Sequence, residues 1–257
     1  MDSRFKVKQI TKLYESCERC GLPVINCICS IVKKINTKAK IWILSTEREF
    51  RRPSNTARLI KLANPDSTEL FLWERTNHPK KLVQYINSGS FDVYILFPNE
   101  NSLSEEDFRR RNLNKNIIAS NYYNSDKNSF PNDNEGSGHN ELTNICSDLE
   151  NNPRNNYHCV NAPAFIILDG TWKEASRMFR LSGYLKDIPS ISLNPDHSSE
   201  YNLRRGASDG ELCTVEAAIE ILKLNGEIEH ADYMKEIFDL FMKSFKAGAS
   251  GARLKDF

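Results

Sequence analysis

At the centre of this sequence stands the segment Leu168-Asp169-Gly170-Thr171-Trp172-Lys173-Glu174-Ala175-Ser176-Arg177-Met178. The short apolar run 164–168 leads into it between a Pro and a Gly, and such a run predicts a buried strand. From Thr171 onward, apolar side chains recur at helical spacing and predict a helix with one apolar stripe: Trp172, Ala175, Met178 and Phe179. The segment therefore predicts a strand, a tight turn and a helix.

Asp169 follows this predicted strand and is the first candidate for chemistry. In open α/β sheets, ligands bind beyond the carboxyl ends of the strands, where helix amides and a projecting carboxylate can reach the same molecule. The alternative is that Asp169 only caps the helix, a role that Asp often fills. Phosphatases that form an aspartyl-phosphate carry a nucleophilic carboxylate two residues before the Asp of a similar motif. This chain has Ile167 at that position, so a phosphatase of this type is excluded.

Length and composition predict one globular domain with appendages. The 257 residues are 39% hydrophobic and 27% charged, enough for a sizeable core. The formal net charge is only +1, so nucleic-acid binding would need a local basic patch. The first residues lack an apolar signal region and the longest apolar runs are too short to span a bilayer, so we expect a cytoplasmic protein without membrane contact.

Four of the seven cysteines lie within thirteen residues: Cys17, Cys20, Cys27 and Cys29. In a chain without a secretory signal, such cysteines favour thiols or metal ligands over disulfides. Four thiolates suit a structural zinc ion, which would supply the folding energy that a knuckle at residues 1–36 lacks. The alternative is a set of ordinary cytosolic thiols.

The remaining residues, 37–257, alternate predicted strands and helices, as is typical of an α/β domain. Strands are predicted at 39–45, 68–73, 91–97 and 188–193, and helices at 79–87, from 104, from 214 and at about 229–246. A further helix is predicted after Ser54 or Asn55 as its cap. Residues 112–158 differ, because 14 of these 47 are Asn, which predicts a flexible surface insertion.

Two groups of cations could hold phosphate. The first stands beside the amino terminus of a predicted helix, where guanidinium groups and helix amides bind anions: Arg51, Arg52 and Arg58. Alternatively, an arginine of this group forms an ion pair with Glu47 or Glu49. The second group recurs at i, i+4 and i+7 on the central helix and predicts a basic stripe that could face RNA: Lys173, Arg177 and Arg180.

Five sequence blocks, in order, resemble the DTW-domain proteins, the tRNA-uridine aminocarboxypropyltransferases. They are the four-Cys knuckle, Arg52-Pro53-Ser54-Asn55-Thr56-Ala57-Arg58-Leu59-Ile60, Leu96-Phe97-Pro98, the segment 168–178, and Tyr201-x-Leu203-Arg204 leading to Leu212-Cys213-Thr214-Val215-Glu216-Ala217. The chain looks most like the bacterial branch that modifies the variable-loop uridine of tRNA. It departs from the family pattern at Ala57, where Gly is expected, and in the Asn-rich insertion.

The resemblance implies a SPOUT-like α/β fold, a knotted sheet with flanking helices, in which a trefoil knot holds S-adenosylmethionine. It implies transfer of the 3-amino-3-carboxypropyl group to uridine N3. The imide proton of uridine is weakly acidic, so Asp169 would serve as its base, or would instead orient the donor. The cofactor-binding residues that it implies are Phe97, Pro98, Asp169, Gly170, Thr171, Trp172, Leu212, Cys213, Thr214 and Glu216. The expected tRNA face consists of Arg51, Arg52, Asn55, Thr56, Arg58, Lys173, Arg177, Arg180, Arg204 and Arg205.

Two other functions stay open from the sequence. One is a methyltransferase of the same fold, and the other is a non-catalytic, zinc-bearing RNA-binding module. Trp172 could stack on the cofactor or on a base, or simply pack in the core. The oligomeric state also stays open, with a monomer favoured.

Overall fold

The computed structural model describes residues 6–113, 161–193, 199–201, 203 and 212–254. Most of the predicted insertion, together with Arg204 and Arg205, lies outside these residues. The chain divides into two compact units, residues 1–105 with 162–257, and residues 106–161. The first unit contains both the cysteine knuckle and the sheet, and it is the unit described below.

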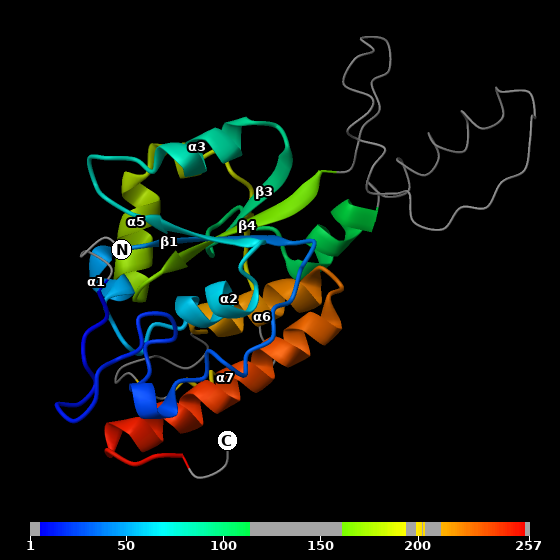
Figure 1. Cartoon of the computed structure of the whole chain (residues 1–257). Coiled ribbons are helices and arrows are strands. Elements are labelled where there is room, and N and C mark those ends of the chain that lie inside the picture. Colours follow the sequence, from blue (N-terminus) through cyan, green and yellow to red (C-terminus); the bar gives the residue numbers. More distant parts are fainter. Residues whose placement is uncertain (1–5, 114–160, 194–198, 202, 204–211, 255–257) are drawn as a thin grey trace, which may run out of the picture. The chain divides into compact units, whose positions relative to one another are not determined.

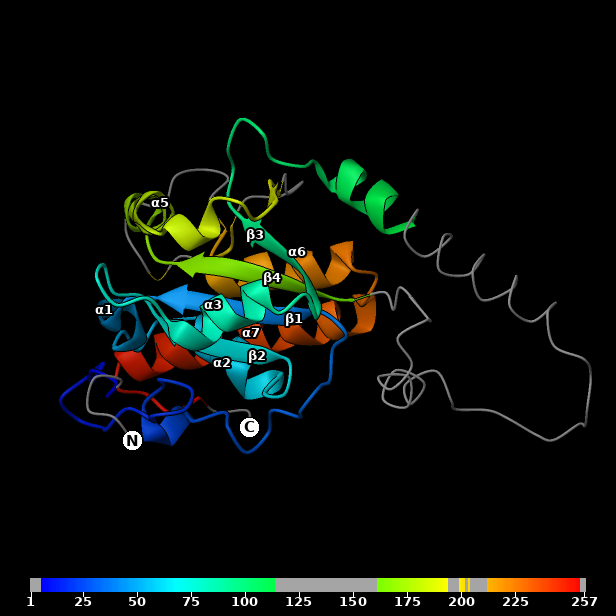
Figure 2. The same cartoon turned by 90° about the horizontal axis from the view of Figure 1, so that it is seen from above.

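Five parallel strands form one sheet in the order β2-β1-β4-β3-β5. They are β1 (Lys40–Ser45), β2 (Thr68–Leu72), β3 (Phe91–Leu96), β4 (Ala162–Asp169) and β5 (Ser190–Ile191). The central strands β1 and β4 lie side by side (Figure 2) and are apolar along most of their length, as expected of strands covered on both faces.

Helices cover both faces of this sheet (Figure 1). On one face lie α3 (Lys80–Asn87) and α5 (Trp172–Leu181), and on the other α2 (Ala57–Ala63), α6 (Thr214–Leu224) and α7 (Ile228–Ala249). Helix α2, in the connection from β1 to β2, and helix α5, which follows β4, therefore lie on opposite faces. This makes the gap between the ends of β1 and β4 a topological switch point, where open α/β sheets bind ligands.

Alternating residues of the central strands build the two halves of the core. On the α3 and α5 side, the strand residues Trp42, Leu44 and Ile166 pack with Ala175 and Met178 of α5 in one buried cluster. The intervening strand residues are buried on the opposite side of the sheet: Ile41, Ile43, Phe165 and Ile167. Among the described helices, none combines the length and the apolar character needed to cross a bilayer.

The structure confirms an α/β fold with the expected strands and corrects two local predictions. The helix α2 has Thr56, and not Ser54 or Asn55, as its N-cap. Pro163, expected to bound a strand, lies inside β4, because β1 starts opposite Ala164 and leaves Pro163 to pair with β3 alone. The implied knot is not shown by the described residues and stays a prediction.

The cysteine knuckle is packed against the rest of its unit, with Asn26 and Gly21 in two of the contacts. Asn26, in the 3-10 helix η2 (Val24–Asn26), is fully buried, donates to the Ala252 carbonyl (2.9 Å) and accepts from the Leu254 amide (3.0 Å). Gly21, with φ +82°, lies so close to the carbonyl oxygen of Pro53 that a Cβ there would be 2.5 Å from it. The knuckle therefore contacts both the loop before α2 and the end of α7.

Gly21→Ala should destabilise the protein more than Gly89→Ala. Both glycines have positive φ, which costs an alanine about 1–2 kcal/mol. At Gly89 nothing lies within 4 Å of an added Cβ, whereas at Gly21 the methyl group also overlaps a backbone carbonyl. Overpacking of this kind adds roughly 1–3 kcal/mol. Urea unfolding of both variants measures the difference, and equal losses would show that the knuckle does not pack tightly on this loop.

Candidate active site

A cavity of about 940 Å³ lies beyond the carboxyl ends of β3, β4 and β5. Its volume is in the range of small-molecule sites. Residues from five separate segments line it, drawn from 52–56, 96–98, 167–175, 191–201 and 212–217. Four of the five blocks that carry the family resemblance therefore meet at one cavity, and the cysteine knuckle is the block that does not line it.

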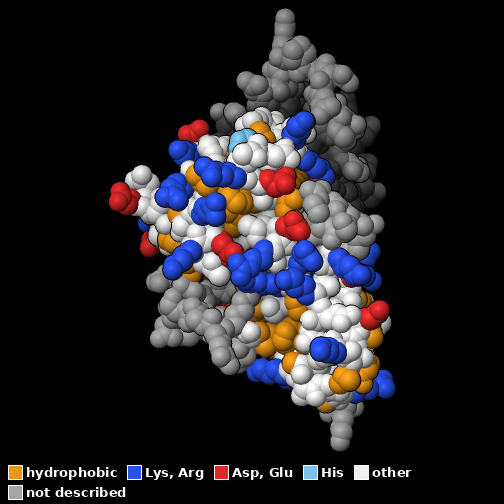
Figure 3. Space-filling view, turned by 90° about the vertical axis from the view of Figure 1, so that its left-hand side faces the viewer, with side chains coloured by type: hydrophobic (Ala, Val, Ile, Leu, Met, Phe, Trp, Pro, Cys, Tyr) orange, Lys and Arg blue, Asp and Glu red, His pale blue; other side chains and the backbone are white. Residues whose placement is uncertain are grey.

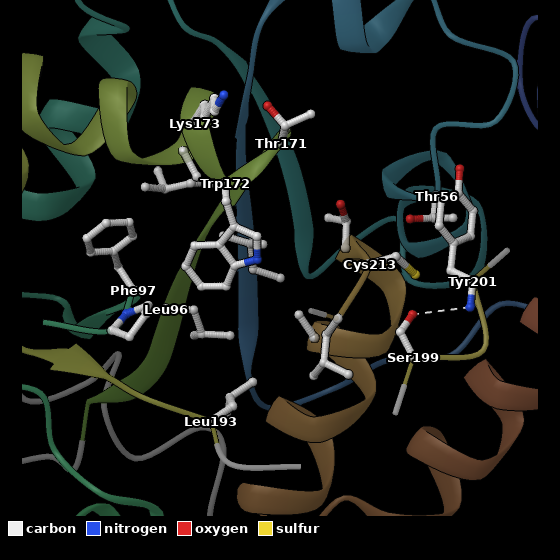
Figure 4. Close-up of a pocket in the computed structure, with 18 of the residues that line it drawn as sticks. Thr56, Leu96, Phe97, Thr171, Trp172, Lys173, Leu193, Ser199, Tyr201 and Cys213 are labelled. Carbon is white, nitrogen blue, oxygen red and sulfur yellow. Dashed lines mark hydrogen bonds between the residues drawn. The ribbon is translucent and has the colours of Figure 1, made fainter. Parts of the chain in front are cut away.

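The cavity has an apolar side and a polar side (Figure 4). Phe97, Leu96 and Leu193 lie on the apolar side, and the indole of Trp172 extends over them into the cavity. Across from them stand four polar side chains: Thr56, Cys213, Ser199 and Tyr201. A ligand with one apolar and one polar end would therefore bind in a single direction.

Trp172 does not pack in the core with the rest of its predicted stripe. Ala175 and Met178 are buried, but Trp172 is 41% exposed. Its ring centroid lies 6.4 Å from that of Phe97, which in turn stacks on Phe179 at 4.5 Å. Phe97 and Phe179 therefore support an aromatic surface beside the cavity, and the indole of Trp172 stays partly accessible.

The N-cap of α5 is Thr171, so the helix-cap alternative for Asp169 is wrong. Thr171 and Glu174 form a capping box, in which the Thr171 amide donates to the Glu174 carboxylate (2.9 Å). Burial raises the pKa of Glu174, but the hydrogen bonds from Thr171 and the nearby Arg52 and Arg48 outweigh this and lower it. Glu174 is thus a carboxylate that completes the helix terminus.

The carboxylate of Asp169 is buried and accepts three hydrogen bonds. One oxygen accepts from the Ser45 hydroxyl (2.6 Å) and the Asn55 amide (2.7 Å), and the other accepts from the Thr214 hydroxyl (2.5 Å). Asp169 is not among the residues that line the cavity. Its carboxylate instead ties the end of β4 to the end of β1, to the loop before α2 and to the start of α6.

Glu216, in the first turn of α6, also joins neighbouring segments through its carboxylate. It is buried and accepts from the Ser199 hydroxyl (2.6 Å) and from the backbone amides of Glu200 and Cys213 (2.7 Å each). These bonds fix the segment 199–201 against α6, and Tyr201 then donates to the Ser54 carbonyl (2.6 Å). Glu216, expected to hold the cofactor, therefore lies behind the cavity wall.

Eight of the ten expected cofactor residues line the cavity, and sequence reasoning missed other residues of the site. The cavity is lined by these expected cofactor residues: Phe97, Pro98, Gly170, Thr171, Trp172, Leu212, Cys213 and Thr214. Sequence reasoning missed Ser45, which meets Asp169 only because β1 and β4 pair in register. It also missed Ser199 and Tyr201, which are held in place by hydrogen bonds to Glu216 and to the Ser54 carbonyl. Ser45 could have been found from the sequence, because it is a polar residue at the end of the apolar strand predicted at 39–45.

The arginines beside α2 have partners. Arg51 pairs with Glu47 (3.5 Å) and Arg52 with buried Glu49 (2.5 Å), as the alternative for this group predicts. Arg58 is buried and donates to the carbonyls of Glu18 (2.8 Å) and Phe50.

Burial lowers the pKa of Arg58 despite the nearby acidic groups. The expectation that Arg58 presents a cation to RNA is therefore corrected, because its guanidinium joins the knuckle to α1 (Glu47–Phe50). Asn55 and Thr56 are also buried, with Asn55 bound to Asp169 and Thr56 on the cavity wall.

The predicted basic stripe on α5 is exposed. It consists of Lys173, Arg177 and Arg180, and the structure shows no ion pair from them to another described residue. Lys and Arg side chains gather across the face of the molecule in Figure 3, which is the left-hand side of Figure 1, where α1 lies. Helix α5 therefore presents positive charge next to the cavity that its first turn lines.

The four predicted metal ligands come together. Their sulfur atoms all lie within 4.8 Å of one another, with 3.7 Å between Cys17 and Cys29 and 3.8 Å between Cys20 and Cys27. A tetrahedral zinc with bonds of about 2.3 Å to sulfur places neighbouring sulfurs about 3.8 Å apart. The residues therefore fit a Cys₄ zinc ion, with no position left for a catalytic water.

A family model described as the DTW domain matches residues 14–246, which includes the knuckle, the sheet and α6. No solved structure matches the chain.

Purified protein should contain on the order of one zinc per chain, because four sulfurs already lie at tetrahedral spacing. Cys20→Ser should lose the metal and lower the melting temperature. Cys213→Ser, at a cysteine outside the cluster, should keep the metal. Elemental analysis of the three proteins decides this, and a metal content unaffected by Cys20→Ser would contradict the assignment.

Asp169→Ala should destabilise the protein by about 3 kcal/mol or more, because the buried donors of Ser45 and Asn55 and the partly buried Thr214 hydroxyl lose their acceptor. Asp169→Asn should lose roughly 1–2 kcal/mol, since its oxygen can still accept from Ser45 and Asn55 while its amide donates to a rotated Thr214 hydroxyl. Urea unfolding measures both. An asparagine as damaging as alanine would mean that the negative charge itself holds these segments together.

Proposed function

The chain belongs to the DTW-domain family, which is associated with tRNA modification, and from this premise we propose that it transfers the 3-amino-3-carboxypropyl group of S-adenosylmethionine to N3 of a uridine in tRNA. The observation that carries the proposal is the convergence of four family blocks on one cavity beyond the carboxyl ends of β3, β4 and β5. The bacterial variable-loop uridine is the target that the sequence resemblance favours.

The two-sided cavity suits S-adenosylmethionine as the donor. The adenine and the methylthio group are the less polar portions of the donor and would lie along Phe97, Leu96 and Leu193. The sulfonium is a cation, and cations within about 6 Å of a tryptophan face are attracted to it. Trp172, which is 41% exposed and lines the cavity, could supply this interaction.

The reaction forms a bond between uridine N3 and the terminal carbon of the aminocarboxypropyl group. The bond between that carbon and sulfur breaks, neutral methylthioadenosine leaves with the electron pair, and the N3 proton passes to a base. Three carbons flank the sulfonium, so the product depends on which one faces N3. Catalysis therefore comes largely from orientation.

Asp169 remains our proposed acceptor of the N3 proton, with one condition that its geometry imposes. Its carboxylate accepts three hydrogen bonds and does not line the cavity. A proton from the substrate must therefore reach Asp169 through a group that does line the cavity. The Thr214 hydroxyl lines the cavity and donates to Asp169, so it could relay the proton.

The exposed stripe on α5 supports tRNA as the acceptor. Lys173, Arg177 and Arg180 could contact phosphates, which position an RNA without reading its sequence. Trp172 begins the same helix, so a base stacked on it would lie next to the phosphates that these cations hold. The zinc knuckle contributes no lining residue to the cavity and would have a structural role.

Incubation of the protein with tRNA and S-adenosylmethionine should produce an aminocarboxypropyl uridine and methylthioadenosine. Mass spectrometry of digested tRNA and of the small-molecule products measures both. S-adenosylhomocysteine with a methylated nucleoside would instead indicate a methyltransferase, and tRNA binding without turnover would indicate a binding module.

Asp169→Asn is the matched variant for this assay, because it is expected to fold. Loss of transfer by about a hundredfold to ten-thousandfold at saturating donor is expected of a removed base. Wild-type transfer by Asp169→Asn would end the general-base assignment and leave Asp169 as a residue that positions the cavity walls.

A further inference from the structure

The cavity has an uneven charge. Among its described lining residues, Arg52 and Lys173 are the charged ones, and neither Asp169 nor Glu216 lines it. In Figure 4 the Lys173 side chain points away from Trp172 and from the polar side chains across the cavity. Within the described region of the cavity, Arg52 is therefore the cation best placed to meet a ligand.

Arg52 is held in place before any ligand binds. Its side chain is 24% exposed, and one guanidinium nitrogen lies 2.5 Å from the carboxylate of fully buried Glu49. The backbone amide of Arg52 also donates to the Glu49 carbonyl (3.0 Å), which fixes the residue at the end of α1. A guanidinium has five N–H donors, so Glu49 can orient it and leave donors for a second anion.

The proposed donor has one carboxylate, and it belongs to the group that is transferred. A carboxylate in a partly enclosed cavity needs a cation and hydrogen-bond donors to offset its lost hydration. Ser54 and Thr56 line the same wall as Arg52 and could add hydroxyl donors. The other end of the donor, methylthioadenosine, suits the apolar side.

We propose that Arg52 binds the carboxylate of the aminocarboxypropyl group and so selects which carbon of the sulfonium faces the acceptor. This inference rests on the proposed function and moves Arg52 from the expected tRNA face to the donor site. With the carboxylate held by Arg52 and the adenosine held near Phe97, the propyl chain spans the cavity between them. Arg52 is thus a specificity-determining residue for transfer of this group over the methyl group.

The direct test compares two donors, S-adenosylmethionine and decarboxylated S-adenosylmethionine, which lacks only the carboxylate. Binding of each is measured by calorimetry. The wild-type protein should prefer the carboxylated donor by roughly ten- to a hundredfold, the usual contribution of hydrogen bonds to a charged group. In Arg52→Gln this preference should fall nearly to unity through weaker binding of S-adenosylmethionine alone.

Two further variants separate binding from folding. Arg52→Gln removes a counter-ion of buried Glu49, so the double variant Glu49→Gln with Arg52→Gln, which removes both charges, is tested beside it. It should also lose the donor preference while keeping a near wild-type melting temperature. Arg51→Gln, at the neighbouring arginine that pairs with Glu47 and does not line the cavity, should retain the preference.

The other outcomes have distinct meanings. If the preference for S-adenosylmethionine persists in Arg52→Gln and in the double variant, the inference is wrong. If the variants instead lose only tRNA affinity, with a shallower salt dependence, Arg52 is a phosphate contact and the inference is equally wrong. If the wild-type protein binds neither donor, the proposed function fails and this inference fails with it.

Discussion

The structure depends on one buried carboxylate. Asp169 receives hydrogen bonds from Ser45, Asn55 and Thr214, which come from three separate segments, while its own backbone ends the central strand β4. Charge-assisted hydrogen bonds are shorter and stronger than neutral ones, and here each crosses from one element to another. The spacing of the cavity walls therefore follows from the position of a single side chain that does not reach the cavity surface.

Much of this fold could be predicted from hydrophobic periodicity and turn residues, because these report on local structure. The segment around Asp169 forms the predicted strand and helix, and the four cysteines converge as expected. Burial was harder to predict. Arg58 looked like a surface cation, and only the fold shows that its guanidinium lies between the knuckle and α1. Trp172 fell on an apolar stripe, yet the cavity leaves it exposed.

The knuckle and the cavity share one loop. Gly21 packs against Pro53, and Arg58 donates to the backbone of Glu18 and Phe50, so the knuckle supports residues 50–58 from one side. The same loop supplies Arg52, Ser54 and Thr56 to the cavity on its other side. A metal ion held by the four cysteines would then stabilise one wall of the cavity without lining it.

The strand order has a consequence for how the chain folds during synthesis. Strands β1 and β3 do not pair with each other, because β4 inserts between them. Until residue 169 has left the ribosome, the nascent chain exposes two apolar strands whose inner edges have no partner, and unpaired edges of this kind invite association with other chains. Pairing β1 with β4 also closes a loop of more than a hundred residues, and contacts between such distant residues slow folding. The sheet should therefore close late, and chaperones that shield unpaired strands should matter more for this protein than for one whose neighbouring strands follow each other in the chain.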